Sequence, residues 1–147
     1  MMRGSAMKYI KIIAIVVLGI WLAIVVVFES LIGYMQPTSS DSVTITTYDA
    51  EGNSFDRVLS GLESGGQFYV AVNHWPREWY NRLLEIPQVR ITRGEETRDY
   101  VAIRVFGEEA ARVKREYPRG VVVGFLMGFA PRYIVRLDPV ADPSSVG

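Results

Sequence analysis

The sequence predicts a mainly β domain of the α+β class, a partly open β-barrel of about six strands with two or three helices. One transmembrane helix precedes it. Three observations carry this prediction: six β-rich segments bounded by turn residues, two stretches of helical spacing between them, and a long apolar run before them all. Six short strands curl readily into a closed or split barrel, which removes exposed sheet edges.

The apolar run from Ile12 to Phe28 has neither a charged residue nor a proline. Its length is roughly 25 Å as a helix, and flanking apolar residues extend it to the ~30 Å hydrocarbon thickness. A cleaved signal peptide usually has a shorter run followed by small residues, whereas ESLIGYMQP follows here. A buried helix of a soluble protein more often has a polar stripe. We therefore expect a membrane anchor.

Basic residues flank the run on one side only. Arg3, Lys8 and Lys11 precede it, and the next basic residue after it is Arg57. The positive-inside rule then predicts a single-pass protein of the cell membrane with a cytoplasmic N-terminus and an extracytoplasmic domain. The predicted organisation is a short basic N-terminus at 1–8, a transmembrane anchor at 9–34, a linker at 35–42, a barrel domain at 43–138 and a flexible tail at 139–147.

Composition excludes several classes of function. Without Arg3, Lys8, Lys11 and Glu29, the 16 basic and 16 acidic residues become 13 and 15, which gives no basic face for nucleic acid. The chain has no cysteine, so disulfides, thiolate nucleophiles and thiolate metal sites are impossible. Its single histidine, His74, excludes a site of two histidines from one chain but allows an axial haem ligand or a proton donor. We expect no metal site.

The strand pattern is clearest at both ends of the domain. The first predicted strand alternates apolar residues with threonines and stops at the turn 49–53. The run FYVAV at 68–72 is continuously apolar, which is typical of a strand buried on both faces. The turns SGGQ (64–67) and RGEE (93–96) separate further strands. The six predicted strands are 43–47, 54–62, 68–72, 88–93, 97–106 and 132–137.

Two segments have the signature of helices. Pro76 suits a first helical position, Pro87 ends the helix, and Trp79, Leu83 and Ile86 form an apolar stripe between them. The segment 107–118 begins acidic and ends basic, as the helix dipole favours. The segment GVVVGFLMGFA at 120–130 fits either a helix or a strand.

Three stretches carry a resemblance to a known family: VTITTYDAEGNSFDRVL, FYVAVNHWPREWYNRLLEIPQVRI and PRYIVRL. Over residues 43–138 the chain resembles the deazaflavin-dependent nitroreductase and quinone reductase family, flavin-type oxidoreductases built on a split β-barrel. In that family the loop after the third strand and the start of the next helix line the cofactor pocket. The resemblance implies cofactor contacts from Asn73, His74, Trp75 and Trp79, and a deazaflavin coenzyme or FMN as cofactor.

One turn departs from the family pattern. Relatives commonly carry a basic, glycine-rich turn for the cofactor phosphate between the first two strands, whereas residues 46–52 here read TTYDAEG. Asp49 and Glu51 would repel a phosphate. We expect Arg57, on the next strand, to supply a cation in place of that turn. Tyr133 and Tyr117 correspond weakly to tyrosines near the pocket in related enzymes, and Tyr133 is our second catalytic candidate after His74.

The segment NHWPREWYNRL at 73–83 has two interpretations. The structural one makes Trp79 and Leu83 core residues and gives His74 a helix-capping role. The functional one uses the free N–H groups of the helix N-terminus to attract an anion, Trp75 to cover a ring system, and His74 to deliver a proton to a quinone or nitro oxygen.

The sequence thus predicts a membrane-anchored flavin- or deazaflavin-type oxidoreductase that reduces a quinone, nitro compound or other lipophilic acceptor. The alternative is a non-catalytic envelope domain that has inherited the barrel and binds a haem, a lipid or a protein partner. The lipid bilayer is the expected partner of the N-terminal helix, and a homodimer is compatible with either function.

Overall fold

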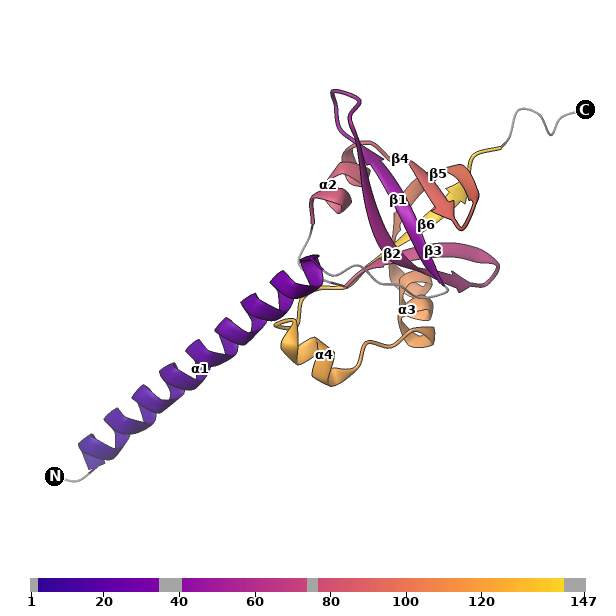
Figure 1. The fold of residues 1–147 in the computed structure, drawn as a ribbon. Helices are drawn as coiled ribbons and strands as arrows, with labels where there is room; N and C mark the ends of the chain where they lie inside the picture. Colours follow the sequence, from indigo (N-terminus) through magenta and orange to yellow (C-terminus); the bar gives the residue numbers. More distant parts are fainter. Residues whose placement is uncertain (1–2, 35–40, 74–76, 142–147) are drawn as a thin grey trace, which may run out of the picture. The chain divides into compact units, whose positions relative to one another are not determined.

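A computed structural model describes residues 3–34, 41–73 and 77–141 (Figure 1). The chain divides into two compact units. One comprises Met1–Met35 together with Gly120–Phe129, and the other comprises Gln36–Arg119 with Ala130–Gly147. The segment 120–129, which the sequence assigns to the barrel domain by position, therefore groups with the N-terminal helix.

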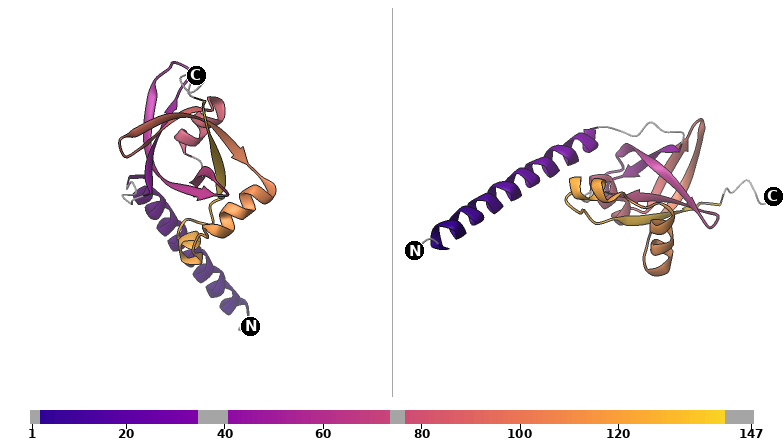
Figure 2. Two further views of the ribbon diagram at one scale, coloured as in Figure 1. Left: turned by 90° about the vertical axis from the view of Figure 1, so that its right-hand side faces the viewer. Right: turned by 90° about the horizontal axis from the view of Figure 1, so that it is seen from below.

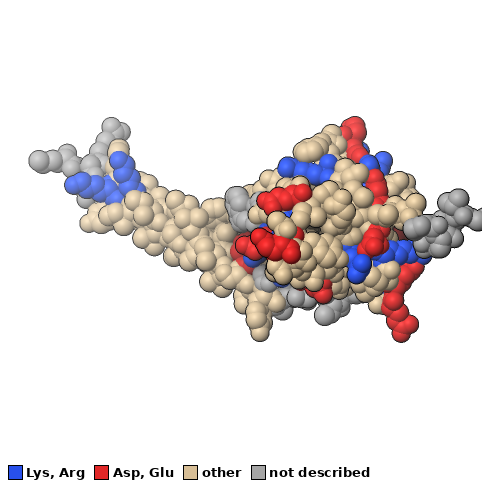
Figure 3. Space-filling model, turned by 90° about the horizontal axis from the view of Figure 1, so that it is seen from above, with Lys and Arg blue, Asp and Glu red and all other residues tan. Residues whose placement is uncertain are grey.

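Helix α1 (Arg3–Tyr34) forms most of the first unit. Its stretch Ala6–Ile32 is long and apolar enough to cross a membrane, the criterion that both a membrane anchor and a signal sequence satisfy. Most of its apolar side chains are exposed. The face of this helix drawn in Figure 3 is mostly uncharged, with basic side chains near its N-terminal end. Near its other end the helix contains Glu29.

The second unit is a closed antiparallel barrel (Figures 1 and 2). Around the barrel the strands follow the order β1-β2-β3-β6-β5-β4. The order shows that the last strand inserts between the third and fifth, so the barrel is more than a series of hairpins. The strands are β1 (Ser42–Tyr48), β2 (Ser54–Ser64), β3 (Gln67–Val72), β4 (Gln88–Arg93), β5 (Glu96–Val105) and β6 (Tyr133–Pro139).

The turn between β2 and β3 explains one of the sequence signals. Gly65 and Gly66 form a two-residue connection and both have positive φ, 58° and 75°. A type I′ hairpin needs positive φ at both central residues, which glycine adopts without a steric cost. The predicted turn at 64–67 is confirmed.

The barrel interior is the larger core. Alternate residues of β1, Val43 and Ile45, point inward with Val70, Val72, Val135 and Leu137. Helix α2 (Glu78–Glu85) contributes Trp79, Tyr80 and Leu83 to this core. Arg82 fixes the same helix to β1, since its Nε donates to the buried Thr47 hydroxyl at 3.2 Å.

Helix α3 (Gly107–Glu116) covers the outer face of β3 and β6 with a second apolar cluster. Tyr69 lies in this cluster, whereas its neighbour Val70 points into the barrel. This two-sided burial accounts for the continuous apolar run at 68–72. Around the cluster, the Tyr69 hydroxyl donates to Glu109 at 3.0 Å, and Arg136 bonds both Glu109 and Asp138.

The fold class predicted from the sequence is confirmed: six antiparallel strands form a barrel, and a long apolar helix precedes it. Boundaries shift by only one or two residues at most ends, as at β6, which runs two residues beyond the predicted 132–137. The segment that fitted either a helix or a strand contains helix α4 (Val121–Leu126).

Candidate functional site

Strands β3 and β6 bring three polar side chains together where β3 ends and β6 begins. Val72 pairs with Tyr133, so the next residue of β3, Asn73, lies beside Arg132. Arg119 joins them, because its Nη1 donates to the Asn73 carbonyl at 3.2 Å and to the Ala130 carbonyl at 2.9 Å. Arg132 Nη1 donates to the Tyr117 carbonyl. We call Asn73, Arg119 and Arg132 the arginine cluster.

The arginine cluster carries positive charge. Within the described ranges, neither Arg119 nor Arg132 has a carboxylate at ion-pair distance. Burial lowers the pKa of the Arg132 guanidinium, and the nearby Arg119 lowers it further. An anion between the two guanidinium groups would relieve this repulsion.

Buried polar atoms without partners lie in the same region. The Asn73 Oδ1, Arg132 Nε and Tyr80 hydroxyl atoms are buried, and none of them has a hydrogen-bond partner in the described structure. Most buried polar atoms are paired, because an unpaired one costs about 1–3 kcal/mol. The Arg132 Nε–H and Tyr80 O–H groups are donors that an anion could satisfy, whereas the Asn73 Oδ1 atom is an acceptor and needs a donor from a ligand.

An aromatic pair lies at the barrel rim next to this cluster. Tyr80 of α2 and Tyr133 of β6 stack with their planes 1° apart and their centroids 5.4 Å apart. Arg104 of β5 lies 4.2 Å above the Tyr133 ring. Burial raises the pKa of the Tyr80 phenol, while the charge on Arg104 opposes the shift. Tyr80 is 2% exposed, and Tyr133 contacts Tyr80 and Arg104 through its ring. The site therefore places guanidinium groups beside a packed aromatic pair.

The structure describes four of the predicted site residues. Asn73 belongs to the arginine cluster, and Tyr133 belongs to the aromatic pair. Trp79 is 5% exposed and packs in the barrel core, edge-on to Tyr80 at 6.0 Å, which is the packing role that its helical spacing favours. Its predicted contact with a cofactor stays a prediction. His74 and Trp75 lie outside the described residues.

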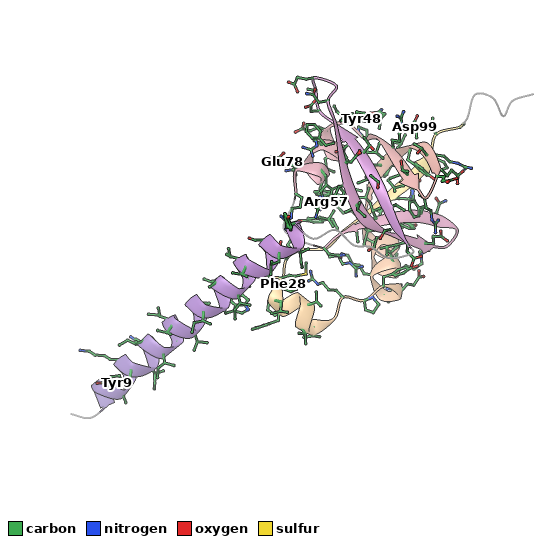
Figure 4. The ribbon with its side chains drawn as sticks, viewed as in Figure 1. Tyr9, Phe28, Tyr48, Arg57, Glu78 and Asp99 are labelled. Atoms are coloured by element: carbon green, nitrogen blue, oxygen red, sulfur yellow. The ribbon has the colours of Figure 1, made fainter. Side chains whose placement is uncertain are left out.

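Arg57 lies on β2, opposite Ile45 of β1, and is partly buried (Figure 4). The antiparallel pairing of β2 with β3 directs the N-terminal half of β2, where Arg57 lies, toward the end of β3 that carries Asn73. Its predicted cofactor contact stays a prediction. The structure thus brings together Asn73 and Tyr133 from the predicted set, through the pairing of β3 with β6.

The acidic turn between β1 and β2 has a structural explanation. Asp49 accepts hydrogen bonds from the Asn53 backbone N–H at 2.8 Å and from its side-chain amide at 2.9 Å. The side-chain bond from Asn53 holds the pKa of Asp49 below its usual value. The carboxylate closes the hairpin, so this turn does not have the chemistry of a phosphate site.

A second hollow lies at the opposite end of β3. This cavity of about 470 Å³ is bordered by the β2–β3 and β4–β5 turns, with Phe68 and Tyr100 in its wall. Its cations are already neutralised: Arg93 pairs with Glu63 at 2.8 Å, and Arg98 pairs with Glu96. It lacks the uncompensated charge that distinguishes the arginine cluster.

Sequence reasoning missed four residues of this site: Tyr80, Arg104, Arg119 and Arg132. For Arg104 a signal existed, because it shares the inward-facing parity of Ala102 in the same strand. Arg119 and Arg132 flank the uncharged segment 120–130 and belong to no motif. Only the pairing of β3 with β6 brings them beside Asn73.

Comparisons with known proteins establish the fold of the barrel and not its function. No family model and no curated protein matches the chain. Among solved structures, HutZ, the haem storage protein from Vibrio cholerae, has a TM-score of 0.54 and 20% identity, and the match covers 71% of this chain and 84% of HutZ. A putative pyridoxamine 5′-phosphate oxidase from Listeria innocua has a TM-score of 0.50 and 10% identity, covering 69% and 85%.

A haem-binding protein from Mycobacterium smegmatis has a TM-score of 0.50 and 18% identity, covering 70% of this chain and 52% of that protein. Both similar haem proteins and the putative oxidase share one architecture with this chain. The second unit is therefore a split β-barrel of the pyridoxamine 5′-phosphate oxidase-like kind. This fold is found in the putative oxidase and in proteins that bind or store haem.

Proposed function

We propose that this protein is a membrane-anchored oxidoreductase that binds an anionic flavin-type cofactor, FMN or the deazaflavin coenzyme, and reduces a quinone, nitro compound or other lipophilic acceptor. One observation carries the proposal: Arg119 and Arg132 form a pair of neighbouring guanidinium groups without an acid in the described structure, beside unpaired buried polar atoms.

The residues of the arginine cluster fit the phosphate of such a cofactor. Guanidinium groups bind phosphate oxygens through charge-assisted hydrogen bonds, and the remaining N–H groups of Arg119 and Arg132 are suitable donors. They would replace the basic turn that is absent between β1 and β2, where Asp49 closes the hairpin instead. Arg57 is the further candidate for charge near the cofactor.

The residues at the rim have the properties needed near a ring system. Tyr133, the partly buried member of the aromatic pair, can border the ring with its edge, and the Asn73 Oδ1 atom can accept a hydrogen bond from a ring N–H. When bound, the flavin-type ring supplies the redox chemistry. We propose that His74 and Tyr133 move the proton to the acceptor oxygen, and that Trp75, with Trp79 behind it, excludes water from the ring.

The anchor explains a lipophilic acceptor. If α1 spans the bilayer, the barrel is tethered where quinones dissolve. We propose a single-pass topology with a cytoplasmic N-terminus, based on Lys8 and Lys11 at one end of the span and no basic residue near the other. A reporter fused to the C-terminus tests it. Because reduced deazaflavin is made in the cytoplasm, a reporter active outside would favour a different electron donor for this protein.

A second candidate function is haem binding. HutZ, a haem storage protein, shares the barrel over 84% of its own length. Haem propionates are anions that Arg119 and Arg132 could hold, and His74, the only histidine, directly follows Asn73 and could be the axial ligand. Both functions use the arginine cluster, and they differ in the group that is bound.

The deciding experiment is an absorption spectrum of the detergent-purified full-length protein, followed by titration with FMN, the deazaflavin coenzyme and haem. A flavin-like chromophore whose affinity falls in both Arg119→Gln and Arg132→Gln supports the oxidoreductase. A Soret band that disappears in His74→Ala supports haem binding instead. Arg98→Gln is the matched control, because Arg98 is an exposed arginine that pairs with Glu96 away from the site. A protein that binds none of the three would refute both functions.

A further inference from the structure

The segment 120–129, which connects α3 to β6, has no charged residue. Its ten residues, GVVVGFLMGF, include no polar side chain. Several of them are exposed, from 41% at Val123 to 83% at Val121, together with Val122, Phe125 and Phe129. Exposed apolar groups concentrated in one short segment require a partner, because isolated soluble domains rarely expose such patches.

The segment packs on α1, within the first unit. The Trp21 Nε1 atom donates to the Phe125 carbonyl at 3.2 Å, and the Trp21 ring lies 5.7 Å from the Phe125 ring and 6.4 Å from the Phe129 ring. One turn further along α1, Val25 faces Gly128, where an added Cβ would come within 3.0 Å of its Cγ1 atom. The segment 120–129 therefore contacts the apolar helix α1 directly.

These contacts fall inside the apolar part of α1. The twenty residues from Tyr9 to Phe28, both marked in Figure 4, contain one charged residue, Lys11 near their N-terminal end, and stop just before Glu29. As a helix they measure about 30 Å, the thickness of the hydrocarbon core. Trp21 then lies about 10 Å and Val25 about 4–5 Å inside the boundary at Phe28. A segment that packs on Trp21 and Val25 lies at the same depth.

The backbone of the segment suits an apolar surrounding. Beyond α4, the turn closes on itself: the Gly128 N–H donates to the Phe125 carbonyl at 3.1 Å and the Phe129 N–H to the Gly124 carbonyl at 2.8 Å. The Trp21 indole satisfies the Phe125 carbonyl further. Backbone inside a bilayer must be paired internally, and this turn largely meets that condition. At the base, Arg119 Nη1 binds the Ala130 carbonyl, so the segment leaves and re-enters the barrel unit at neighbouring points.

We propose that residues 120–129 are a second membrane-embedded element, which enters the bilayer beside α1 and places Phe125 and Phe129 among the lipid acyl chains of one leaflet. The inference rests on the proposed membrane anchor. The occupant of the exposed apolar face is lipid, because the face continues the lipid-facing surface of α1 at the same depth. The membrane-embedded part of the protein then consists of a helix and a loop.

The absence of cysteine makes the test direct. We would introduce single cysteines in place of Phe129, Val16 and Glu95, one at a time, and spin-label each variant of the full-length protein in phosphatidylcholine nanodiscs. The measurement is the accessibility of each label to oxygen and to a water-soluble nickel chelate. Val16→Cys reports the anchor, and Glu95→Cys, at the exposed β4–β5 turn, reports the aqueous reference. The proposal predicts that the Phe129→Cys label lies about 10 Å inside the hydrocarbon boundary.

The possible outcomes distinguish a failure of this proposal from a failure of the proposed membrane anchor. A label at Val16 that is accessible to the nickel chelate would overturn the anchor and the inference with it. A lipid-buried Val16 label with a water-accessible Phe129 label would overturn the inference alone. A Phe129 label shielded from both reagents, with dipolar broadening from a second label, would assign the face to another copy of the chain and also overturn it.

Discussion

The phosphate-binding role of the arginine cluster yields a quantitative prediction for Arg132→Gln. The substitution removes a guanidinium whose neighbour is a second cation and for which the described structure offers no acid. A charge-assisted hydrogen bond contributes about 1.5–3 kcal/mol, so losing one to the phosphate should weaken FMN binding about 10- to 150-fold. Riboflavin, which has the same ring and no phosphate, should bind the wild-type and variant proteins with similar affinity.

The assay is a titration of flavin fluorescence with FMN and with riboflavin. Arg119→Gln should reduce FMN affinity comparably, and the double variant should lose less than the sum, because both groups would hold the same phosphate. Since Arg132 also bonds the Tyr117 carbonyl, the unfolding midpoint of each variant is measured in parallel, with Arg98→Gln as the surface control. Equal weakening of FMN and riboflavin would refute phosphate binding by this cluster.

Three further predictions concern stability and the rim of the barrel. Partial burial alone would raise the pKa of Glu109, but hydrogen bonds from Arg136 and Tyr69 outweigh it and hold the pKa below its usual value. The stability that this gives is present at neutral pH and is lost on acidification. When the urea unfolding midpoint is measured against pH, Glu109→Gln should therefore make the decrease at acidic pH smaller. Leu83→Ala should destabilise the barrel by about 2–5 kcal/mol in urea unfolding, since Leu83 is 1% exposed; a loss under 1 kcal/mol would contradict the core assignment. Tyr80→Phe should leave the midpoint unchanged or higher, because its hydroxyl is buried without a partner, and should weaken flavin binding if that hydroxyl meets the ring.

The sequence predicted the elements of this protein better than its site. Alternation in β1, the apolar run of β3 and the prolines around α2 are local signals, and each corresponds to an observed element. Helix α2 begins at Glu78, with Arg77 as its N-cap, two residues later than predicted. The departure at Asp49 was visible as a pattern, but its cause, the bonds to Asn53, required the hairpin geometry.

The site depended on long-range pairing. Arg119 and Arg132 have no periodicity or motif of their own, and they meet Asn73 only because β6 inserts between β3 and β5. The packing of α4 on α1 could not be predicted from local sequence either, because the contact between Trp21 and Phe125 joins residues 104 positions apart. The apolar composition of the segment 120–130 fitted either a helix or a strand, and it did not predict that the segment packs on α1.

The most direct test of the central claim is electron transfer in a membrane. The full-length protein in nanodiscs is loaded with reduced FMN or reduced deazaflavin under anaerobic conditions, mixed with a long-chain quinone in the same bilayer, and followed by absorbance. We predict reoxidation of the bound cofactor at a rate that falls in His74→Ala, with binding retained. A cofactor that stays reduced with both the quinone and a nitroaromatic acceptor would contradict the oxidoreductase and leave a binding protein on a flavin-type barrel.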